Sequence, residues 1–189
     1  MRRYSSIFIV GVLIVLASVA LNVLQAKRII ELQRGSTSSG TGAELSVGSH
    51  LSEINARDLR GSDLKLSFNS KVQKPKVLYI FSPSCVWCQR NAENVNSLVA
   101  QTQDRYDFIA LSLSTEGVAK FVSDHQSKFP VYQNLSAETI GAYRVASTPE
   151  TFVISTDGTV LATWQGAYTG ATKLDMEKFF AARLPDSGS

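Results

Sequence analysis

Cys85 and Cys88 are the residues of this chain whose types and spacing could do chemistry. No other cysteine occurs among its 189 residues, and two intervening residues place the pair one turn apart on a helix. The free N–H groups and the dipole at a helix N-terminus stabilise a thiolate, so a helix that begins at Cys85 would make this residue a nucleophile. Cys88 could then displace a substrate sulfur from Cys85. The pair therefore predicts dithiol exchange, with Cys85 attacking and Cys88 resolving.

Two other roles for the cysteines stay open. A zinc or copper site would need further ligands, and the histidines of the sequence are His50 and His125. One alternative is therefore a copper or zinc module built on Cys85 and Cys88 with His125. The other is a buried and inert pair. We expect no resident metal and no cofactor, and no glycine-rich phosphate loop occurs in the sequence.

The hydrophobic pattern around the pair predicts a strand followed by a helix. Residues 77–81 are a nearly continuous run of β-formers, typical of a strand buried on both faces. Residues 86–102 repeat apolar side chains at helical spacing, so Cys85 should stand where this helix begins. The same reasoning predicts strands at 108–113, 151–155 and 160–164, helices at 115–126, 138–143 and 172–183, and a hairpin over 46–68 that turns at 60–63. This alternation predicts an α/β domain with a mixed central sheet flanked by helices.

An apolar run precedes this domain. Residues 7–24 carry no charge and would form a helix of about 27 Å, nearly enough to cross a bilayer. A cleaved signal peptide is the competing hypothesis, because Arg2 and Arg3 precede the run and Ser18-Val19-Ala20 would suit a signal peptidase. We predict a transmembrane anchor with a juxtamembrane helix over 1–34, a flexible linker over 35–43 and a folded domain over 44–185.

The charge balance argues against nucleic-acid binding. The chain carries a net charge of +3, but residues 44–189 hold 14 Lys and Arg against 15 Asp and Glu, which gives 14 − 15 = −1. Binding to phosphates needs a basic face, and this part of the sequence offers no extended run of Lys or Arg. The positive excess instead flanks the apolar run.

Thr148-Pro149 comes just before the predicted strand at 151–155. The simplest interpretation is a trans proline that starts a strand, where its missing N–H removes no ladder hydrogen bond. A cis bond is rarer, but it would leave the backbone of Thr148 exposed to pair with an extended substrate.

These segments resemble the thioredoxin fold and, within it, the membrane-anchored TlpA/ResA-like thiol-disulfide oxidoreductases. The resemblance is carried by Phe81-Ser-Pro-Ser-Cys-Val-Trp-Cys88, by residues 142–158 and by the entry segment from Val47-Gly48 to Gly61. It implies a thioredoxin-like fold that follows the N-terminal hairpin and the transmembrane helix.

The resemblance also implies roles for residues outside the cysteine pair. Pro149 would be the family's cis-proline, and Asp157-Gly158 would be its hairpin turn. Thr148, Pro149 and Trp87 are then the expected substrate-binding residues.

The function implied by the resemblance is dithiol exchange with protein thiols and disulfides outside the cytoplasm. The anchor would hold the domain at the bacterial inner membrane, and an electron-donating thiol oxidoreductase of that membrane would be its partner. The resemblance favours a reductant, and a disulfide oxidase or isomerase is the alternative.

The sequence also departs from the pattern of these families. Thioredoxins carry a buried Asp six positions before the first cysteine, where this chain has Tyr79. ResA-like proteins carry a Glu six positions after it, where this chain has Asn91. Glu93 lies about 200° around the helix from Asn91 and would not replace that carboxylate.

Peroxiredoxins share this fold and carry Pro-x-x-x-Thr/Ser-x-x-Cys. Counting back seven positions gives Leu78 from Cys85 and Phe81 from Cys88. The motif is absent, so the sequence does not predict a peroxidase.

Overall fold

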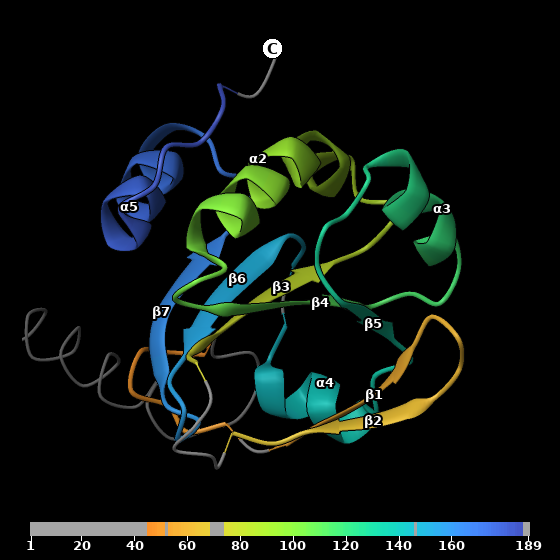
Figure 1. Cartoon of the computed structure of the whole chain (residues 1–189). Helices are drawn as coiled ribbons and strands as arrows, with labels where there is room; N and C mark the ends of the chain where they lie inside the picture. Colours follow the sequence, from red (N-terminus) through yellow and green to blue (C-terminus); the bar gives the residue numbers. More distant parts are fainter. Residues whose placement is uncertain (1–44, 52, 69–73, 146, 187–189) are drawn as a thin grey trace, which may run out of the picture. The chain divides into compact units, whose positions relative to one another are not determined.

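The computed structural model describes residues 45–51, 53–68, 74–145 and 147–186 (Figure 1). Its elements, in chain order, are β1 (Ile54–Asp58), β2 (Asp63–Leu66), β3 (Lys76–Phe81), α2 (Val86–Thr102), β4 (Asp107–Ser112), α3 (Val118–Asp124), β5 (Val131–Gln133), α4 (Ala137–Tyr143), β6 (Glu150–Ile154), β7 (Val160–Gln165) and α5 (Gly170–Phe180). The predicted anchor over 1–34 and linker over 35–43 lie outside the described residues. Within the described ranges, no helix combines the length and the apolar character needed to cross a membrane.

The strands form one mixed sheet in the order β2-β1-β5-β4-β3-β6-β7. β3, β4 and β5 run parallel, whereas β6 runs antiparallel to β3 and β7 antiparallel to β6. Every residue of β3 is buried, which explains why its sequence is almost continuously apolar instead of alternating. The predicted α/β fold with a mixed central sheet is confirmed.

The predicted hairpin is β1 and β2, which pair antiparallel around a turn that ends before Asp63. The hairpin joins the sheet through β5, a strand of three residues that the sequence analysis missed. Three residues are too few to show a periodic pattern. β5 is recognisable only in the structure, where Val131 and Tyr132 continue the ladder beside β4.

Helices cover both faces of the sheet, with α2, α3 and α5 on one face and α4 on the other (Figure 1). Cys88 and Tyr79 belong to the core cluster on the first face. Leu78, Ile80 and Tyr143 belong to the cluster on the second face. Because successive side chains of a strand point to opposite faces, β3 directs Tyr79 toward the cysteine-bearing helix.

Two helices differ in extent from the sequence prediction. α3 is shorter than the predicted 115–126, because Gly117 adopts a φ of 74° immediately before it. α5 begins and ends before the predicted 172–183, and Ala181 ends it with a left-handed φ of 46°. Apolar periodicity carries no signal for either dihedral angle.

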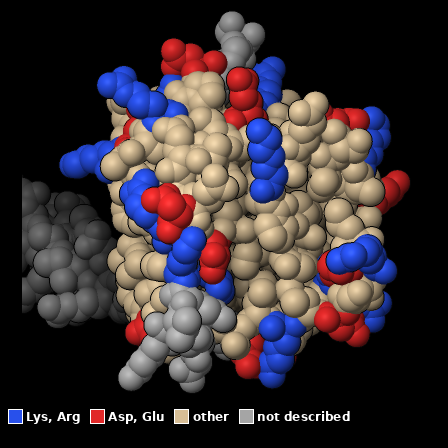
Figure 2. Space-filling model, in the orientation of Figure 1, with Lys and Arg blue, Asp and Glu red and all other residues tan. Residues whose placement is uncertain are grey.

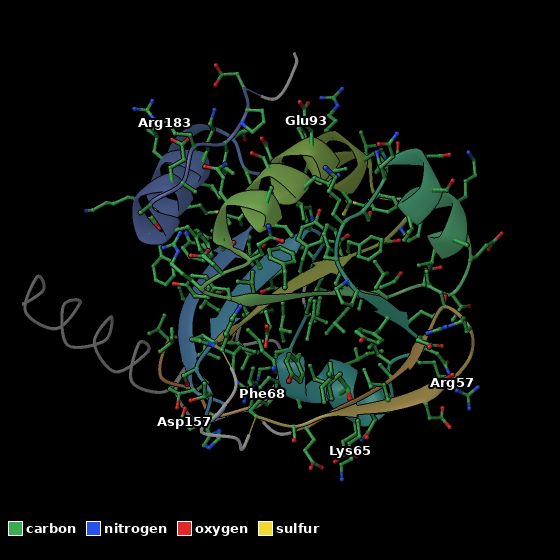
Figure 3. The ribbon with its side chains drawn as sticks, viewed as in Figure 1. Arg57, Lys65, Phe68, Glu93, Asp157 and Arg183 are labelled. Carbon is green, nitrogen blue, oxygen red and sulfur yellow. The ribbon has the colours of Figure 1, made fainter. Side chains whose placement is uncertain are left out.

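The β6–β7 turn packs against the first described segment of the chain. The Ser155 hydroxyl donates to the Asp157 carboxylate within the turn. Asp157 is labelled in Figure 3. The Leu51 N–H donates to the Gly158 carbonyl at 2.8 Å. The predicted turn at Asp157-Gly158 is confirmed, and it also ties the entry segment to the sheet.

We expect Gly158→Ala to lower the free energy of unfolding by about 2 kcal/mol or more. Gly158 has a φ of +93°, and a Cβ there would lie 2.7 Å from His50 Cε1 and 2.9 Å from the Leu51 carbonyl oxygen. Urea unfolding of the unmodified chain and of Gly158→Ala measures the loss of unfolding free energy. Gly61→Ala is the matched control, because its φ of +89° is equally strained for alanine but its Cβ would meet open space. Equal losses at both positions would contradict the packing argument.

Charges of both signs are mixed over the surface. Figure 2 shows Lys and Arg interspersed with Asp and Glu on one face, without a continuous basic area among the described residues of that face. Lys65 pairs with Glu53, and Lys120 pairs with Asp124.

Candidate active site

Cys85 is the N-cap residue of α2, at the end of the loop that leaves β3. Its Sγ accepts a hydrogen bond from the Cys88 N–H at 3.2 Å, and its thiol donates to the Thr148 carbonyl at 3.3 Å. The Cys85 N–H donates to the Ser82 carbonyl at 3.0 Å, which fixes the loop before the helix. Both cysteines are free thiols in this structure. A sulfur at the N-cap thus receives a helix N–H, a contact that stabilises a thiolate.

The two thiols lie in different environments. Cys85 is partly exposed. Burial acts to raise its pKa, but hydrogen bonds from the side chains of Cys88 and Thr148 and from the backbone of Cys88 and Trp87 favour the thiolate; together they outweigh burial and lower the pKa of Cys85 below its ordinary value. Cys88 is fully buried, and burial followed by the side-chain bond with Cys85 raises the pKa of Cys88 to about 12. As the pH rises, Cys85 therefore ionises first while Cys88 keeps its proton.

The structure brings Cys85, Thr148 and Pro149 together. Thr148 is half-buried, Pro149 is buried, and the peptide bond between them is cis. The trans interpretation that the sequence alone favours is therefore wrong, and the cis-proline implied by the resemblance is present. A sequence rule that counts all X–Pro bonds cannot identify the individual cis bond.

Exposed apolar side chains occupy the first turn of α2. Val86 is 58% exposed and Trp87 is 53% exposed. The guanidinium carbon of Arg90 lies 5.2 Å from the centroid of the Trp87 ring, a cation–π contact that fixes the ring at the surface. Trp87 thus presents an aromatic surface in the turn that follows Cys85.

An open depression of about 490 Å³ lies beside the cysteine loop. Pro83 and Ser84 line its wall next to Cys85, and Phe121 and His125 line its wall on α3. In Figure 1 the start of α3 and the start of α2 lie near the carboxyl ends of β3 and β4. Parallel strands commonly place binding surfaces at this end of a sheet.

A family model described as the AhpC/TSA family matches residues 47–163, which is more than half of the chain. The chain belongs to the AhpC/TSA family. No curated protein matches it in sequence.

Solved structures share the fold of this AhpC/TSA protein at low sequence identity. The thioredoxin domain of a thiol-disulfide oxidoreductase from Bacteroides vulgatus has a TM-score of 0.60 and 18% identity, covering 72% of this chain and 99% of that chain. A secreted Mycobacterium tuberculosis disulfide oxidoreductase described as homologous to E. coli DsbE has a TM-score of 0.55 and 19% identity, covering 67% and 93%. StoA from Bacillus subtilis has a TM-score of 0.53 and 17% identity, covering 67% and 96%. The predicted thioredoxin-like fold is confirmed.

Two positions that hold carboxylates in thioredoxins and in ResA-like proteins hold neutral side chains in this chain, Tyr79 and Asn91. In this AhpC/TSA protein Tyr79 is 1% exposed. Asn91 is also buried, and its Oδ1 accepts the Tyr168 N–H at 2.9 Å. Glu93 lies exposed on the outer side of α2 (Figure 3), as its helical position predicted. It therefore does not supply the missing carboxylate.

Asn91 is part of a buried polar cluster that the sequence analysis missed. The Asn94 Nδ2 donates to the Tyr168 carbonyl at 3.3 Å, and the hydroxyls of Tyr168 and Thr151 bond at 2.8 Å. We call Asn91, Asn94, Thr151 and Tyr168 the Tyr168 clamp. Its one signal in the sequence is the pair of asparagines three residues apart on the buried side of α2. The clamp holds the loop before α5 against the cysteine-bearing helix.

Neither histidine completes a metal site with the two cysteines among the residues that the structure describes. His125 is the C-cap residue of α3, and its ring centroid lies 4.5 Å from that of Phe121. The backbone of His50 forms an isolated antiparallel β-bridge with Thr159. In the part of the chain that the structure describes, no three His, Cys, Asp or Glu side chains gather to hold a metal ion. The copper or zinc alternative therefore has no third ligand there.

We expect iodoacetamide to alkylate Cys85 and to spare Cys88 near neutral pH. The thiolate is the reactive form, so the rate at Cys85 should reach half its maximum below the ordinary pKa of a thiol, while Cys88 should react only well above neutral pH. Mass spectrometry of peptides after timed labelling measures both rates. Cys85→Ser is the control and should remove the labelling at neutral pH. Faster labelling of Cys88 would contradict the assignment.

Proposed function

We propose that this chain is a thiol-disulfide oxidoreductase that exchanges its Cys85–Cys88 dithiol with the disulfide of a protein substrate. The observation that carries the proposal is the contrast between a partly exposed Cys85 with a lowered pKa and a buried Cys88 with a raised pKa, one helical turn apart. An ionised first thiol and a protonated second thiol suit attack followed by resolution. Membership of the AhpC/TSA family and the thioredoxin-like fold support this chemistry.

The exchange proceeds in two balanced steps. In the first, the Cys85 thiolate attacks one sulfur of the substrate disulfide, and the other substrate sulfur leaves and takes a proton from solvent. In the second, Cys88 loses its proton and its thiolate attacks Cys85 Sγ. The remaining substrate sulfur then leaves and takes up a proton. The substrate disulfide gains two electrons, and the Cys85–Cys88 disulfide forms.

We assign substrate contact to Thr148, Pro149 and Trp87. The Thr148 carbonyl already lies 3.3 Å from Cys85 Sγ, so a substrate segment at the sulfur would run beside the Thr148 backbone. Main-chain pairing of this kind binds an extended segment with little dependence on its sequence. The exposed Trp87 ring would add apolar contact.

We place the domain outside the cytoplasm, tethered to the bacterial inner membrane by residues 1–34. The support is the uncharged run at 7–24 and the resemblance to TlpA/ResA-like proteins. An electron-donating thiol oxidoreductase in the same membrane would keep Cys85 and Cys88 reduced, which makes this chain a reductant. Resistance to carbonate extraction, together with digestion of the domain by protease added to spheroplasts, tests the placement. Protection of the domain from that protease would refute it.

The reduction potential of the pair tests the function and its direction. The full chain is equilibrated with dithiothreitol or glutathione buffers, and alkylation followed by mass spectrometry measures the Cys85–Cys88 disulfide. About 30 mV changes this two-electron equilibrium tenfold. A strongly negative potential supports a reductant, and a potential near those of oxidising catalysts supports an oxidase or isomerase. Failure to form the disulfide would refute the proposal, and faster turnover of hydrogen peroxide than of protein disulfides would assign a peroxidase instead.

A further inference from the structure

The open depression of about 490 Å³ lies between the loop that carries Cys85 and helix α3. Pro83 and Ser84, the two residues before Cys85, form one of its walls, and Gly117 and Phe121 belong to the other. A Cβ at Gly117 would lie 3.4 Å from Pro83 Cβ, so the start of α3 packs closely against the cysteine loop. Figure 1 shows α3 beside the start of α2. The depression therefore adjoins the residue that attacks the substrate.

Hydrogen bonds fix the backbone of Glu116, which lines the same depression. The Leu113 N–H donates to the Phe81 carbonyl at 2.9 Å and ties the end of β4 to the end of β3. The Glu116 N–H donates to the Ser114 hydroxyl at 3.0 Å, in the turn that leads to α3. Because the loop of Cys85 also begins at the end of β3, the Glu116 backbone is held in a set place relative to Cys85.

Aromatic rings form the α3 side of the depression. Phe121 is 6% exposed, and its ring centroid lies 4.7 Å from that of Phe81 and 4.5 Å from that of His125. Phe121 and His125 both line the depression. Aromatic surface of this kind suits the aliphatic stem of a long side chain, and a ring face also attracts a cation.

The charges around the depression do not cancel. Apart from its histidine, the charged side chains of the lining are Glu116, Lys120 and Asp124, and Lys120 pairs with Asp124 at 2.7 Å. Among the described residues, no Lys or Arg forms an ion pair with Glu116. Arg90 lies over the Trp87 ring and is not part of the lining. The Glu116 carboxylate is therefore the uncompensated charge, and it favours a cationic group in the depression.

A substrate segment beside Thr148 would direct alternate side chains toward the cysteine loop. The side chains of an extended segment alternate between its two sides, so the residue two positions from the substrate cysteine points the same way as that cysteine. It lies about 7 Å along the segment, at about 3.4 Å per residue. Because Ser84 joins Cys85 to the wall of the depression, a long side chain at that position would enter the depression.

We propose that the depression is a specificity subsite for a Lys or Arg side chain two positions from the substrate cysteine, and that Glu116 binds its charge. The inference rests on the proposed function and names the substrate class. The aliphatic stem of the side chain packs on the rings of Phe121 and His125, and its charged end pairs with the Glu116 carboxylate. The preferred substrates are therefore protein disulfides with a basic residue at this spacing from the cysteine that Cys85 attacks.

The test measures the first step with three synthetic peptides and the full chain. Each peptide has one cysteine, carried as a mixed disulfide with thionitrobenzoate. The residues two positions before and after the cysteine are both lysine, both norleucine or both glutamate. The Cys85 thiolate attacks the peptide sulfur, because thionitrobenzoate is the better leaving group, and the S–S bond to thionitrobenzoate breaks. Stopped-flow absorbance of the released thionitrobenzoate gives the rate constant for each peptide.

For the unmodified chain at low ionic strength, we expect the lysine peptide to react about threefold faster than the norleucine peptide and about tenfold faster than the glutamate peptide. Glu116→Gln should lower the ratio of the lysine rate to the glutamate rate to about threefold or less. Glu116→Lys should reverse the preference. The peptides react with the same thiolate, so the ratio cancels any change in the reactivity of Cys85.

Glu93→Gln is the matched control, because it removes one exposed carboxylate on the outer side of α2 (Figure 3). It should keep the ratio of the unmodified chain. An unchanged ratio in Glu116→Gln would overturn the proposal, as would an equal loss in Glu93→Gln or equal rates for the lysine and norleucine peptides. Failure of the unmodified chain to release thionitrobenzoate from any of the three peptides would refute the proposed function itself, so the two failures are distinguishable.

Discussion

Replacing Cys85 by serine should abolish turnover, with a loss of at least about a thousandfold. A serine hydroxyl is not ionised at neutral pH and cannot form the mixed disulfide with a substrate. The lost group is also the sulfur that the N-terminal turn of α2 stabilises, through the Cys88 N–H at 3.2 Å. Reduction of a protein disulfide by the full chain, with dithiothreitol as the electron source, measures the loss.

A matched control separates loss of the nucleophile from damage to the helix. Ser97 lies on α2, where its hydroxyl accepts a hydrogen bond from Gln101 and does not face the cysteines. Ser97→Ala should therefore retain the activity of the unmodified chain. If Cys85→Ser retained activity as well, Cys85 would not be the attacking residue.

Replacing Cys88 by serine should trap a covalent adduct between Cys85 and the substrate. Cys85 keeps its partly exposed position and can still attack, but the thiol that lies one turn along the helix and releases the substrate is gone. Turnover should fall on the order of a hundredfold or more, while the mixed disulfide accumulates. Non-reducing gel electrophoresis followed by mass spectrometry identifies the adduct and the cysteine that carries it.

Two observations check that the adduct is the expected intermediate. Dithiothreitol should release the substrate, because the link is a disulfide. The variant with both cysteines replaced should form no adduct, since the attacking sulfur is then absent. Normal turnover by Cys88→Ser would show that the roles of the two cysteines are misassigned.

The opposite behaviour expected of the two cysteines follows from their burial. Serine at either position removes one sulfur, yet only the partly exposed sulfur can reach a disulfide on another protein. Cys88 is completely buried, so the sulfur that it attacks is Cys85 Sγ, which is by then bonded to the substrate. The two variants therefore stop the reaction at different steps, one before the mixed disulfide and one after it.

The local part of this site was predictable from the sequence. The buried strand β3, the start of α2 at Cys85 and the one-turn spacing to Cys88 all follow from short-range rules of periodicity and helix capping. The departures at Tyr79 and Asn91 could also be read from position alone. The predicted anchor and linker lie outside the described residues and stay predictions.

The tertiary structure decided what depends on contacts between distant residues. Thr148 reaches Cys85 across 63 positions of sequence, and the cis bond before Pro149 is a choice between two isomers that composition does not make. β5 exists because β4 and β1 hydrogen-bond to it. The Tyr168 clamp forms because a loop after β7 folds onto α2. The sequence by itself determined which residues carry the chemistry, because that information is local. The packing of the chain decided the burial of Cys88 and hence the difference in pKa between the two thiols, because burial is a property of the whole core.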